Sequence, residues 1–229
     1  MKTINKDINV SILKLLKWLE TQKKENVYLG FDPYDAKEYF NKLNKFKPLI
    51  IVRKILYLLD EIFCPNLFRK LLLIKPKINA KGQGLLLYAF SQLYITTKNS
   101  TYLNTAESIA KYLIENPSKG YAGLCWGYPF DWQSIIFIPK NTPSTVVSTT
   151  VGDGLFKLYE ATKNNIYLEN CKSICEFLDQ NLNISAKKDN SICISYTPLD
   201  TFQVHNANLF TAEFLIRIGT LSNNKKWVD

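Results

Sequence analysis

The sequence is poor in the residues that punctuate chains of short strands and in those that build disulfide or metal frameworks. Its 229 residues include only nine glycines and nine prolines, which argues against disorder and against a sandwich of many short strands. There is a single histidine, and the five cysteines follow no disulfide-framework spacing. The first ten residues are polar and lysines interrupt the next segment, so we find no secretory signal. We therefore expect a cytoplasmic protein with reduced thiols.

The sequence also has no long uninterrupted apolar run. The most apolar stretch, 48–74, is broken by Arg53, Lys54, Asp60, Glu61, Pro65 and Arg69, so we do not expect it to span a bilayer. The net charge of +9 is uneven: residues 1–81 hold 17 Lys/Arg and 8 Asp/Glu, whereas the remainder holds 12 of each. A basic end attracts anionic polysaccharide, phospholipid or nucleic acid, or is simply a solvated surface. Because no nucleic-acid-binding motif accompanies the charge, we expect no nucleic-acid partner.

An internal repeat is the strongest signal present. Residues 93–116 and 158–181 align without a gap at an offset of 65, and 11 of the 24 positions are identical. Apolar residues at helical spacing precede and follow a polar TKN turn in each copy, so each copy predicts a helical hairpin. Cys171 and Cys175 replace Ala106 and Ala110 in the apolar stripe, and we interpret them as small core residues.

These hairpins predict an all-α fold, an α/α toroid built from helical-hairpin repeats. We treat 1–229 as one partial toroid domain, with basic N-terminal helices at 1–78, repeated hairpins with loops at 79–141 and 142–203, and a further hairpin beginning at 204–229. The last residues match those that begin a helix in the earlier copies, so we expect about half a ring. We expect N-terminal helices over 10–19, 36–44, 48–63 and 67–73, and no strand ladder. Gly152 and Gly154 suit close helix packing.

A long loop follows each hairpin, and the two loops correspond. CWGYPFDWQS (125–134) and CISYTPLDTFQ (193–203) each contain Cys, then Tyr three residues on, Pro, Asp, an aromatic residue and Gln. Equivalent loops of a helical-hairpin ring gather at one rim, where aromatic rings can stack on sugars and polar groups can bind hydroxyls. The residues that we predict to bind substrate are Trp126, Phe130, Trp132, Gln133, Tyr196, Gln203, Asn206, Asn208, Asp32 and Asp35. The alternative is that the aromatic residues are core and the aspartates cap helices.

Catalysis, if present, requires carboxylates or tuned acid–base groups. Asp131 and Asp200 occupy corresponding loop positions, and two carboxylates across a pocket serve glycoside hydrolysis. Tyr128, Tyr196 and His205 could instead abstract a proton, as a uronic-acid lyase or epimerase requires, if their pKa values are tuned. We therefore predict Asp131, Asp200, Tyr128 and His205 as catalytic candidates. A zinc site of Cys125, Cys193 and His205 lacks a clear fourth ligand, so we predict no metal and no cofactor.

Five segments of the sequence carry a resemblance to a known family: GFDPYD, NAKGQGLLLYAF, CWGYPFDWQS, TPSTVV and SYTPLDTFQVHNANLFTAEFL. Together they resemble the α/α-toroid proteins encoded among capsule and exopolysaccharide genes, which are labelled polysaccharide biosynthesis protein of the VpsJ type. The resemblance runs from about Gly30 to the end of the chain. It implies a six-hairpin ring like that of six-hairpin glycosidases, lyases and epimerases, and a role in surface-glycan production. It implies no particular catalytic residue.

Three functions follow from these features. The first is a carbohydrate-active or carbohydrate-binding protein of capsule or exopolysaccharide biosynthesis, whose partner is an oligo- or polysaccharide, an anionic one included. The second is a non-catalytic scaffold that joins other glycan-assembly proteins at the inner membrane, because the basic and amphipathic N-terminal third suits anionic lipid. The third is a helical-repeat peptide binder. The sequence favours the first.

Overall fold

The computed structural model describes residues 2–41, 49–62, 65–189 and 191–228, and its main body consists of helical hairpins. The helices are α1 (Lys2–Gln22), α2 (Asp35–Asn41), α3 (Leu49–Ile62), α4 (Pro65–Leu71), α5 (Ala80–Thr97), α6 (Ser100–Glu115), α7 (Thr145–Thr162), α8 (Asn165–Gln180) and α9 (His205–Ser222), with a 3-10 turn η2 at Lys225–Trp227. The strands form three short antiparallel hairpins, β1 (Lys23–Lys24) with β2 (Val27–Tyr28), β3 (Trp132–Gln133) with β4 (Phe137–Ile138), and β5 (Ile184–Lys188) with β6 (Ser191–Ile194).

The sequence repeat is a structural repeat. α7 and α8 begin and end 65 residues after α5 and α6, and the bounds of α9 lie 60 residues after those of α7. The caps repeat as well: the side chains of Asn99 and Asn164 accept a hydrogen bond from the main-chain N–H two residues on, at the start of α6 and α8. Lys98 and Lys163 end α5 and α7 in the left-handed conformation. The expected all-α fold of hairpin repeats is confirmed, and 145–151 is helical as the repeat requires.

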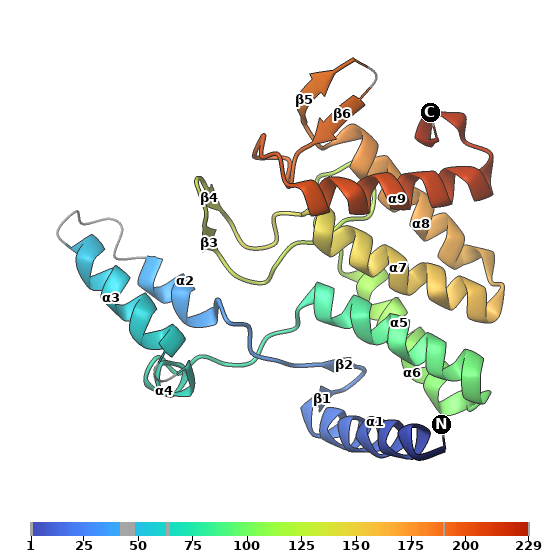
Figure 1. Cartoon of the computed structure of the whole chain (residues 1–229), viewed down its shortest axis with the longest axis horizontal. Coiled ribbons are helices and arrows are strands. Elements are labelled where there is room, and N and C mark those ends of the chain that lie inside the picture. Colours follow the sequence, from blue (N-terminus) through green and yellow to red (C-terminus); the bar gives the residue numbers. More distant parts are fainter. Residues whose placement is uncertain (1, 42–48, 63–64, 190, 229) are drawn as a thin grey trace.

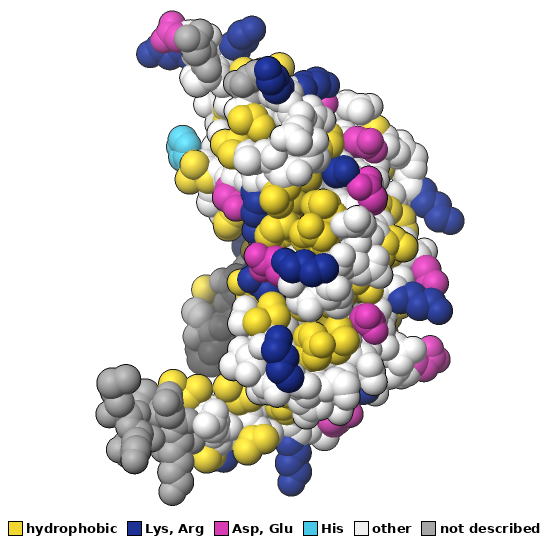
Figure 2. All heavy atoms as spheres, turned by 90° about the vertical axis from the view of Figure 1, so that its right-hand side faces the viewer, with side chains coloured by type: hydrophobic (Ala, Val, Ile, Leu, Met, Phe, Trp, Pro, Cys, Tyr) yellow, Lys and Arg dark blue, Asp and Glu magenta, His cyan; other side chains and the backbone are white. Residues whose placement is uncertain are grey.

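The hairpins form two curved layers. In Figure 1, α5, α7 and α9 lie side by side in one row, and α6 and α8 lie behind them. Figure 2 shows that the molecule curves around a hollow along one side. The main core lies between the two layers, and its fully buried side chains include Leu87, Ile109, Leu155, Ile174 and Phe214. A row of inner helices backed by outer helices is the layering of an α/α toroid.

Glycines permit the close approach of the inner helices. A Cβ at Gly154 of α7 would lie 2.7 Å from the carbonyl oxygen of Gly84 in α5, and one at Gly84 would lie 2.9 Å from the Thr150 oxygen. A Cβ at Gly152 would meet the ring of Phe214 at 2.4 Å. Because real Cβ atoms do not tolerate such distances, the predicted packing role of Gly152 and Gly154 is confirmed.

A smaller unit precedes the hairpins. Helices α2, α3 and α4 pack around Ala36, Phe40 and Ile74, in a cluster separate from the main core. The chain enters this unit past an isolated bridge between Gly30 and Lys77, which ties it to the segment leading into α5. In Figure 1 the unit lies to one side of the hairpin rows. We refer to these three helices and their connections, residues 31–77, as the α2–α4 unit.

The expected helices of the N-terminal part are present with shifted bounds. The helix expected over 10–19 extends over Lys2–Gln22, and the expected ends at 44, 48 and 63 lie outside the described residues. Asp32 caps a turn, because its carboxylate accepts from the Tyr34 N–H at 3.0 Å, while α2 begins only at Asp35. The expectation of no strand ladder was wrong, since β5 and β6 pair over four or five residues.

The cysteines of the apolar stripe are core residues, as predicted. Cys171 and Cys175 are fully buried, and burial raises the pKa of the Cys175 thiol to about 12. Among the described residues, no group of three potential metal ligands lies together. Within the same residues, no helix combines the length and the apolar character needed to cross a bilayer.

Candidate functional site

A cavity of about 430 Å³ lies at the amino-terminal end of α5, where four segments of the chain meet. We call it the aromatic pocket. Its lining residues are Asp32, Pro33, Tyr34, Asn79, Lys81, Gly82, Leu85, Tyr128, Phe130, Trp132 and Tyr196. Five predicted site residues are among them: Asp32, Tyr128, Phe130, Trp132 and Tyr196. They come from the segment before α2 and from both copies of the repeated loop.

The rings of the pocket form one continuous series. Phe130 stacks on Tyr34 at a centroid distance of 5.8 Å and on Tyr128 at 5.3 Å. Trp132 then meets Tyr128 edge-on at 6.4 Å and Tyr196 at 5.9 Å. Phe130 is buried, whereas the other four rings are at least partly exposed. The series therefore presents aromatic surface to the cavity, and the contacts between neighbouring rings hold the rings in place.

The start of α7 holds both loops in position. The Thr145 N–H donates to the Tyr196 carbonyl oxygen at 3.0 Å, and the Ser144 N–H donates to the Trp126 oxygen at 3.0 Å. The Thr145 hydroxyl also donates to the Ser195 oxygen at 3.1 Å. Free amide groups at the first turn of a helix need acceptors, and the two loops supply them. For this reason Tyr128 and Tyr196, which are far apart in sequence, lie against each other.

The two tyrosines are neutral groups at physiological pH. Burial raises the pKa of Tyr128 well above its usual range, and the neighbouring Tyr196 raises it further. Burial also raises the pKa of Tyr196, although hydrogen bonds from Tyr128 and Ser144 oppose this effect. Proton abstraction by a phenolate needs the opposite shift, so these phenols suit hydrogen bonding to a ligand, and the catalytic role of Tyr128 stays a prediction.

One edge of the pocket is polar. The Asp32 carboxylate accepts from Asn79 Nδ2 at 3.1 Å, and the Asp32 N–H donates to Asp35 Oδ2 at 2.6 Å. The Asp35 side chain is buried, its Oδ1 accepts no hydrogen bond, and Lys77 Nζ lies 4.0 Å away. Burial raises the pKa of Asp35, against the lowering effects of the Asp32 main chain and of Lys77. Asp32 therefore faces the pocket as a hydrogen-bonding group, with Asp35 behind it.

A second cavity of about 340 Å³ adjoins the aromatic pocket. The two share Asp32, Asn79, Gly82 and Leu85 in their linings. Asp35 and the exposed ring of Trp18 border the second cavity only. Each of the two cavities has a volume within the range of about 300–1,000 Å³ that small-molecule sites occupy. Because the cavities adjoin, together they have room for a ligand with more than one ring.

The paired loop carboxylates take different roles. Asp200 is buried and accepts from three main-chain N–H groups, those of Tyr196, Thr197 and Phe202, and from the Thr197 hydroxyl, at 2.6–3.0 Å. Asp131 accepts from the Lys140 N–H at 2.7 Å. Neither lines the aromatic pocket. Both carboxylates thus organise their own loops, whereas the alternative that the sequence left open was helix capping, and a catalytic role for either stays a prediction.

The remaining predicted residues lie outside the pocket. His205 and Asn206 are exposed at the start of α9, and Gln203 is exposed just before it. Asn208 accepts from the Ile194 N–H at 3.0 Å, and the exposed Gln133 donates to the Ser134 oxygen. The structure does not bring this group to the aromatic rings, so a role in the same site stays a prediction.

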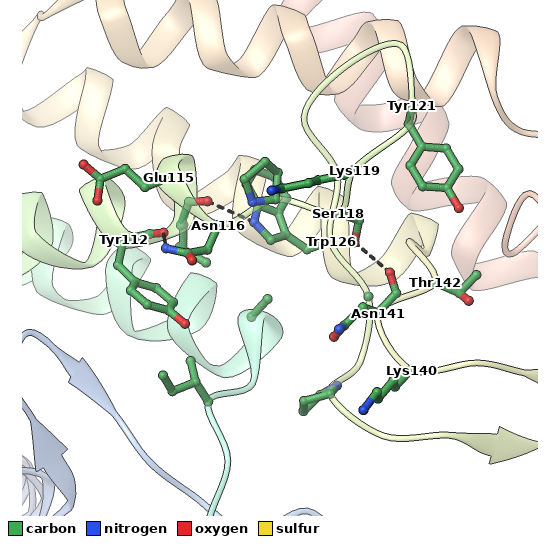
Figure 3. A pocket seen from close by; sticks show the side chains of 16 residues that line it. Tyr112, Glu115, Asn116, Ser118, Lys119, Tyr121, Trp126, Lys140, Asn141 and Thr142 are labelled. Atoms are coloured by element: carbon green, nitrogen blue, oxygen red, sulfur yellow. Dashed lines mark hydrogen bonds between the residues drawn. The ribbon is translucent and has the colours of Figure 1, made fainter.

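Trp126 belongs to a different cavity. It is only 2% exposed, and its indole N–H donates to the Leu113 carbonyl oxygen at 3.1 Å. Figure 3 shows its ring between the end of α6 and the following loop, in a cavity of about 630 Å³ that Lys119 and Lys140 also line. The Ser118 hydroxyl and the Asn116 amide there bond main-chain oxygens. We regard the aromatic pocket as the better site, because four of its rings are at least partly exposed, against two in the other cavity.

Six of the lining residues were not predicted from the sequence, and three of these, Tyr34, Asn79 and Lys81, have side chains suited to binding a ligand. Tyr34 stands in the word GFDPYD beside the predicted Asp32, and it is 46% exposed. Asn79 and Lys81 lie at the start of α5. At the repeat offset of 65 residues they correspond to Ser144 and Val146 at the start of α7. Had the repeat been extended to the segments before the inner helices, it would have indicated that Asn79 and Lys81 lie at the same rim.

Comparisons with known proteins add one structural similarity. Neither a family model nor a curated protein matches the sequence. Among solved structures, the chain is similar to a GH76 α-mannanase of Bacteroides thetaiotaomicron, with 18% identity and a TM-score of 0.48. The match covers 67% of this chain and 42% of the mannanase, so it spans less than half of that protein. A similarity of this level does not identify a function.

Proposed function

We propose that the chain binds carbohydrate in the aromatic pocket. The observation that carries this proposal is the series of rings, Tyr34, Tyr128, Trp132 and Tyr196, around a cavity with a polar edge. Sugar rings have apolar C–H faces that stack on aromatic surfaces and hydroxyl edges that need hydrogen-bond partners. Asp32, Asn79 and the two neutral phenols offer those partners, and Lys81 adds a positive charge that suits an anionic sugar.

Binding is better supported than hydrolysis. Glycoside hydrolysis places two carboxylates across the scissile bond, roughly 5–10 Å apart. Asp32 is the one carboxylate among the residues that line the aromatic pocket, and Asp131 and Asp200 accept hydrogen bonds within their own loops. We therefore propose a carbohydrate-binding protein, and a reaction at this site would have to recruit Asp35 as the partner of Asp32.

The biological setting that we propose is capsule or exopolysaccharide biosynthesis in the cytoplasm. The support for it is the set of sequence words from GFDPYD to the NAN segment, and three of the pocket residues lie in CWGYPFDWQS. In a cell that encodes the protein, loss of the gene should lower the yield of surface polysaccharide. Restoring the wild-type gene should recover it, and restoring Trp132→Ala should not. Equal recovery by both would contradict the link between this pocket and glycan production.

Binding is tested by calorimetry of the full chain with neutral, amino-sugar and uronic-acid oligosaccharides. We expect one class to bind, and Trp132→Ala to weaken its Kd by roughly tenfold through loss of a stacking ring. Phe137→Ala is the matched control, because Phe137 is 51% exposed on the strand paired with Trp132 yet does not line the pocket. If no class binds the folded chain, or if both variants weaken binding equally, the proposal is wrong.

A further inference from the structure

The α2–α4 unit carries an apolar stripe that its own core does not cover. Along α3, the side chains of Ile51, Val52, Ile55, Leu58 and Leu59 are between 38% and 68% exposed. Their spacing of three and four residues places them along one side of the helix. The other side of α3 packs inward, where Leu56 and Tyr57 contact the cluster around Phe40. We call these five exposed side chains the α3 stripe.

Among the described side chains of the α2–α4 unit, the exposed charged groups have one sign. Lys54, Lys70 and Lys75 are exposed in the α2–α4 unit. Among its described side chains, no Asp or Glu is exposed: Asp35 and Asp60 are buried, and Asp32 and Glu38 are half-buried. Glu38 also pairs with Lys77 at 2.7 Å. The surface of this unit therefore combines exposed apolar side chains with exposed lysines.

We propose that the α2–α4 unit binds an anionic membrane surface, with α3 lying in the lipid interface. An amphipathic helix inserts its apolar side at the boundary between headgroups and acyl chains, and flanking lysines gain from the negative surface potential of anionic lipids. The 14 residues of α3 extend about 21 Å, which suits a helix that lies on a bilayer and does not span one. This inference is independent of carbohydrate binding.

The charges favour lipid over a second copy of the chain. A symmetric dimer on this face would bring the same lysines of two copies together, and like charges at an interface weaken association. An anionic lipid surface instead complements both the apolar stripe and the lysines. The same binding would bring the aromatic pocket close to the membrane, because Tyr34 of the pocket belongs to the segment that enters α2.

The test is co-sedimentation of the full 229-residue chain with vesicles. One set is phosphatidylcholine, and the other contains about one-third phosphatidylglycerol. We expect binding to the anionic set at low salt, with clear weakening at high salt because counterions screen the lysines. Replacing Ile55 and Leu58 by serine should weaken binding by roughly tenfold or more, since each removes an apolar side chain from the interface.

Matched variants separate this surface from general effects. Ile166→Ser with Ile216→Ser changes two residues that are 57% and 50% exposed, against 52% and 55% for Ile55 and Leu58, and should leave binding unchanged. Lys54→Gln with Lys70→Gln should weaken binding by roughly tenfold, whereas Lys119→Gln with Lys188→Gln should have little effect. All variants should retain the wild-type melting temperature, because the changed side chains are exposed.

Three outcomes would overturn the proposal. The first is no binding to anionic vesicles at low salt. The second is equal binding to neutral vesicles, which would remove the role of the lysines. The third is a dimer in analytical ultracentrifugation that Ile55→Ser with Leu58→Ser dissociates, which would make a second copy the occupant of the α3 stripe. Loss of vesicle binding with intact sugar binding would leave the proposed function standing.

Discussion

The two copies of the repeat, 79–141 and 142–203, have the same helices and different loops. Their helices begin and end at corresponding residues, offset by 65. The asparagine caps and the left-handed residues that end the inner helices correspond in the same way. Their loops share a sequence pattern, yet the first provides three rings of the aromatic pocket and the second provides one. The hairpins are constrained by packing against neighbouring helices on two sides, whereas the loops at the rim are free to diverge.

Asp131 and Asp200 show how far that divergence has gone. Asp200 is 3% exposed and accepts four hydrogen bonds, so its loop turns around one buried carboxylate. Asp131 accepts one main-chain hydrogen bond in a loop that a short strand pair, β3 with β4, also stabilises. The second loop is thus organised from within, and the first by pairing and by ring packing.

The largest difference between the copies should appear when the two aspartates are replaced. Asp200→Ala should lower the free energy of unfolding by about 3 kcal/mol, because it leaves three main-chain N–H groups, one buried and two part-buried, without an acceptor. Asp131→Ala should cost less than about 1 kcal/mol, since it frees a single N–H at the surface. Urea denaturation of both variants measures the difference. Equal costs would show that the two loops are organised alike.

The two loop cysteines should differ nearly as much in reactivity. Cys125 is fully buried, and burial raises its pKa to about 12, whereas Cys193 is half-buried. Alkylation of the native chain near pH 8, followed by peptide mass spectrometry, should modify Cys193 at least about a hundredfold faster than Cys125. In urea the two rates should converge. A fast native reaction at Cys125 would mean that the first loop opens readily.

Much of the fold could be predicted from the sequence, because helices that pack in a repeated arrangement need apolar residues at repeated positions. The repeat predicted helical hairpins where α5 to α9 lie, including 145–151, whose valines and threonines alone would favour a strand. The hairpin of β5 and β6 was not expected, because Ile184–Lys188 contains two lysines and alternates only weakly. Pairing of two short edge strands depends on contacts between them that neither strand shows alone.

The site was only partly predictable. The loops indicated Tyr128, Phe130, Trp132 and Tyr196, but the sequence could not distinguish them from Trp126, whose ring is buried. Whether an aromatic residue points into the core or toward a cavity depends on the path of its loop. That path is set here by hydrogen bonds to Ser144 and Thr145, and no spacing rule predicts them. Asp32 was predicted to bind substrate and lines the pocket, whereas Tyr34 in the same segment was not predicted.

A third prediction concerns the contact between the two copies. Gly84→Ala and Gly154→Ala should each lower the free energy of unfolding by about 2 kcal/mol, because the added methyl groups would lie 2.9 Å and 2.7 Å from main-chain atoms of the facing helix. Gly82→Ala is the control: its Cβ would have a nearest neighbour at 3.9 Å, so stability should be unchanged or raised by up to about 1 kcal/mol. Thermal and urea unfolding would show this, and a harmless Gly154→Ala would contradict the close crossing.

The smallest effects should fall on the capping asparagines, where the copies are expected to be equal. Asn99 accepts from the Thr101 N–H at 2.9 Å, and Asn164 accepts from the Ile166 N–H at 3.1 Å, at the same position of the hairpin. Replacing either by alanine should lower the free energy of unfolding by about 1 kcal/mol, and the two costs should agree closely. The double variant should show their sum, because separate caps share no partner. Unequal costs would mean that divergence between the copies extends from the loops into the hairpins, since the same hydrogen bond would then contribute differently in two otherwise matching frameworks.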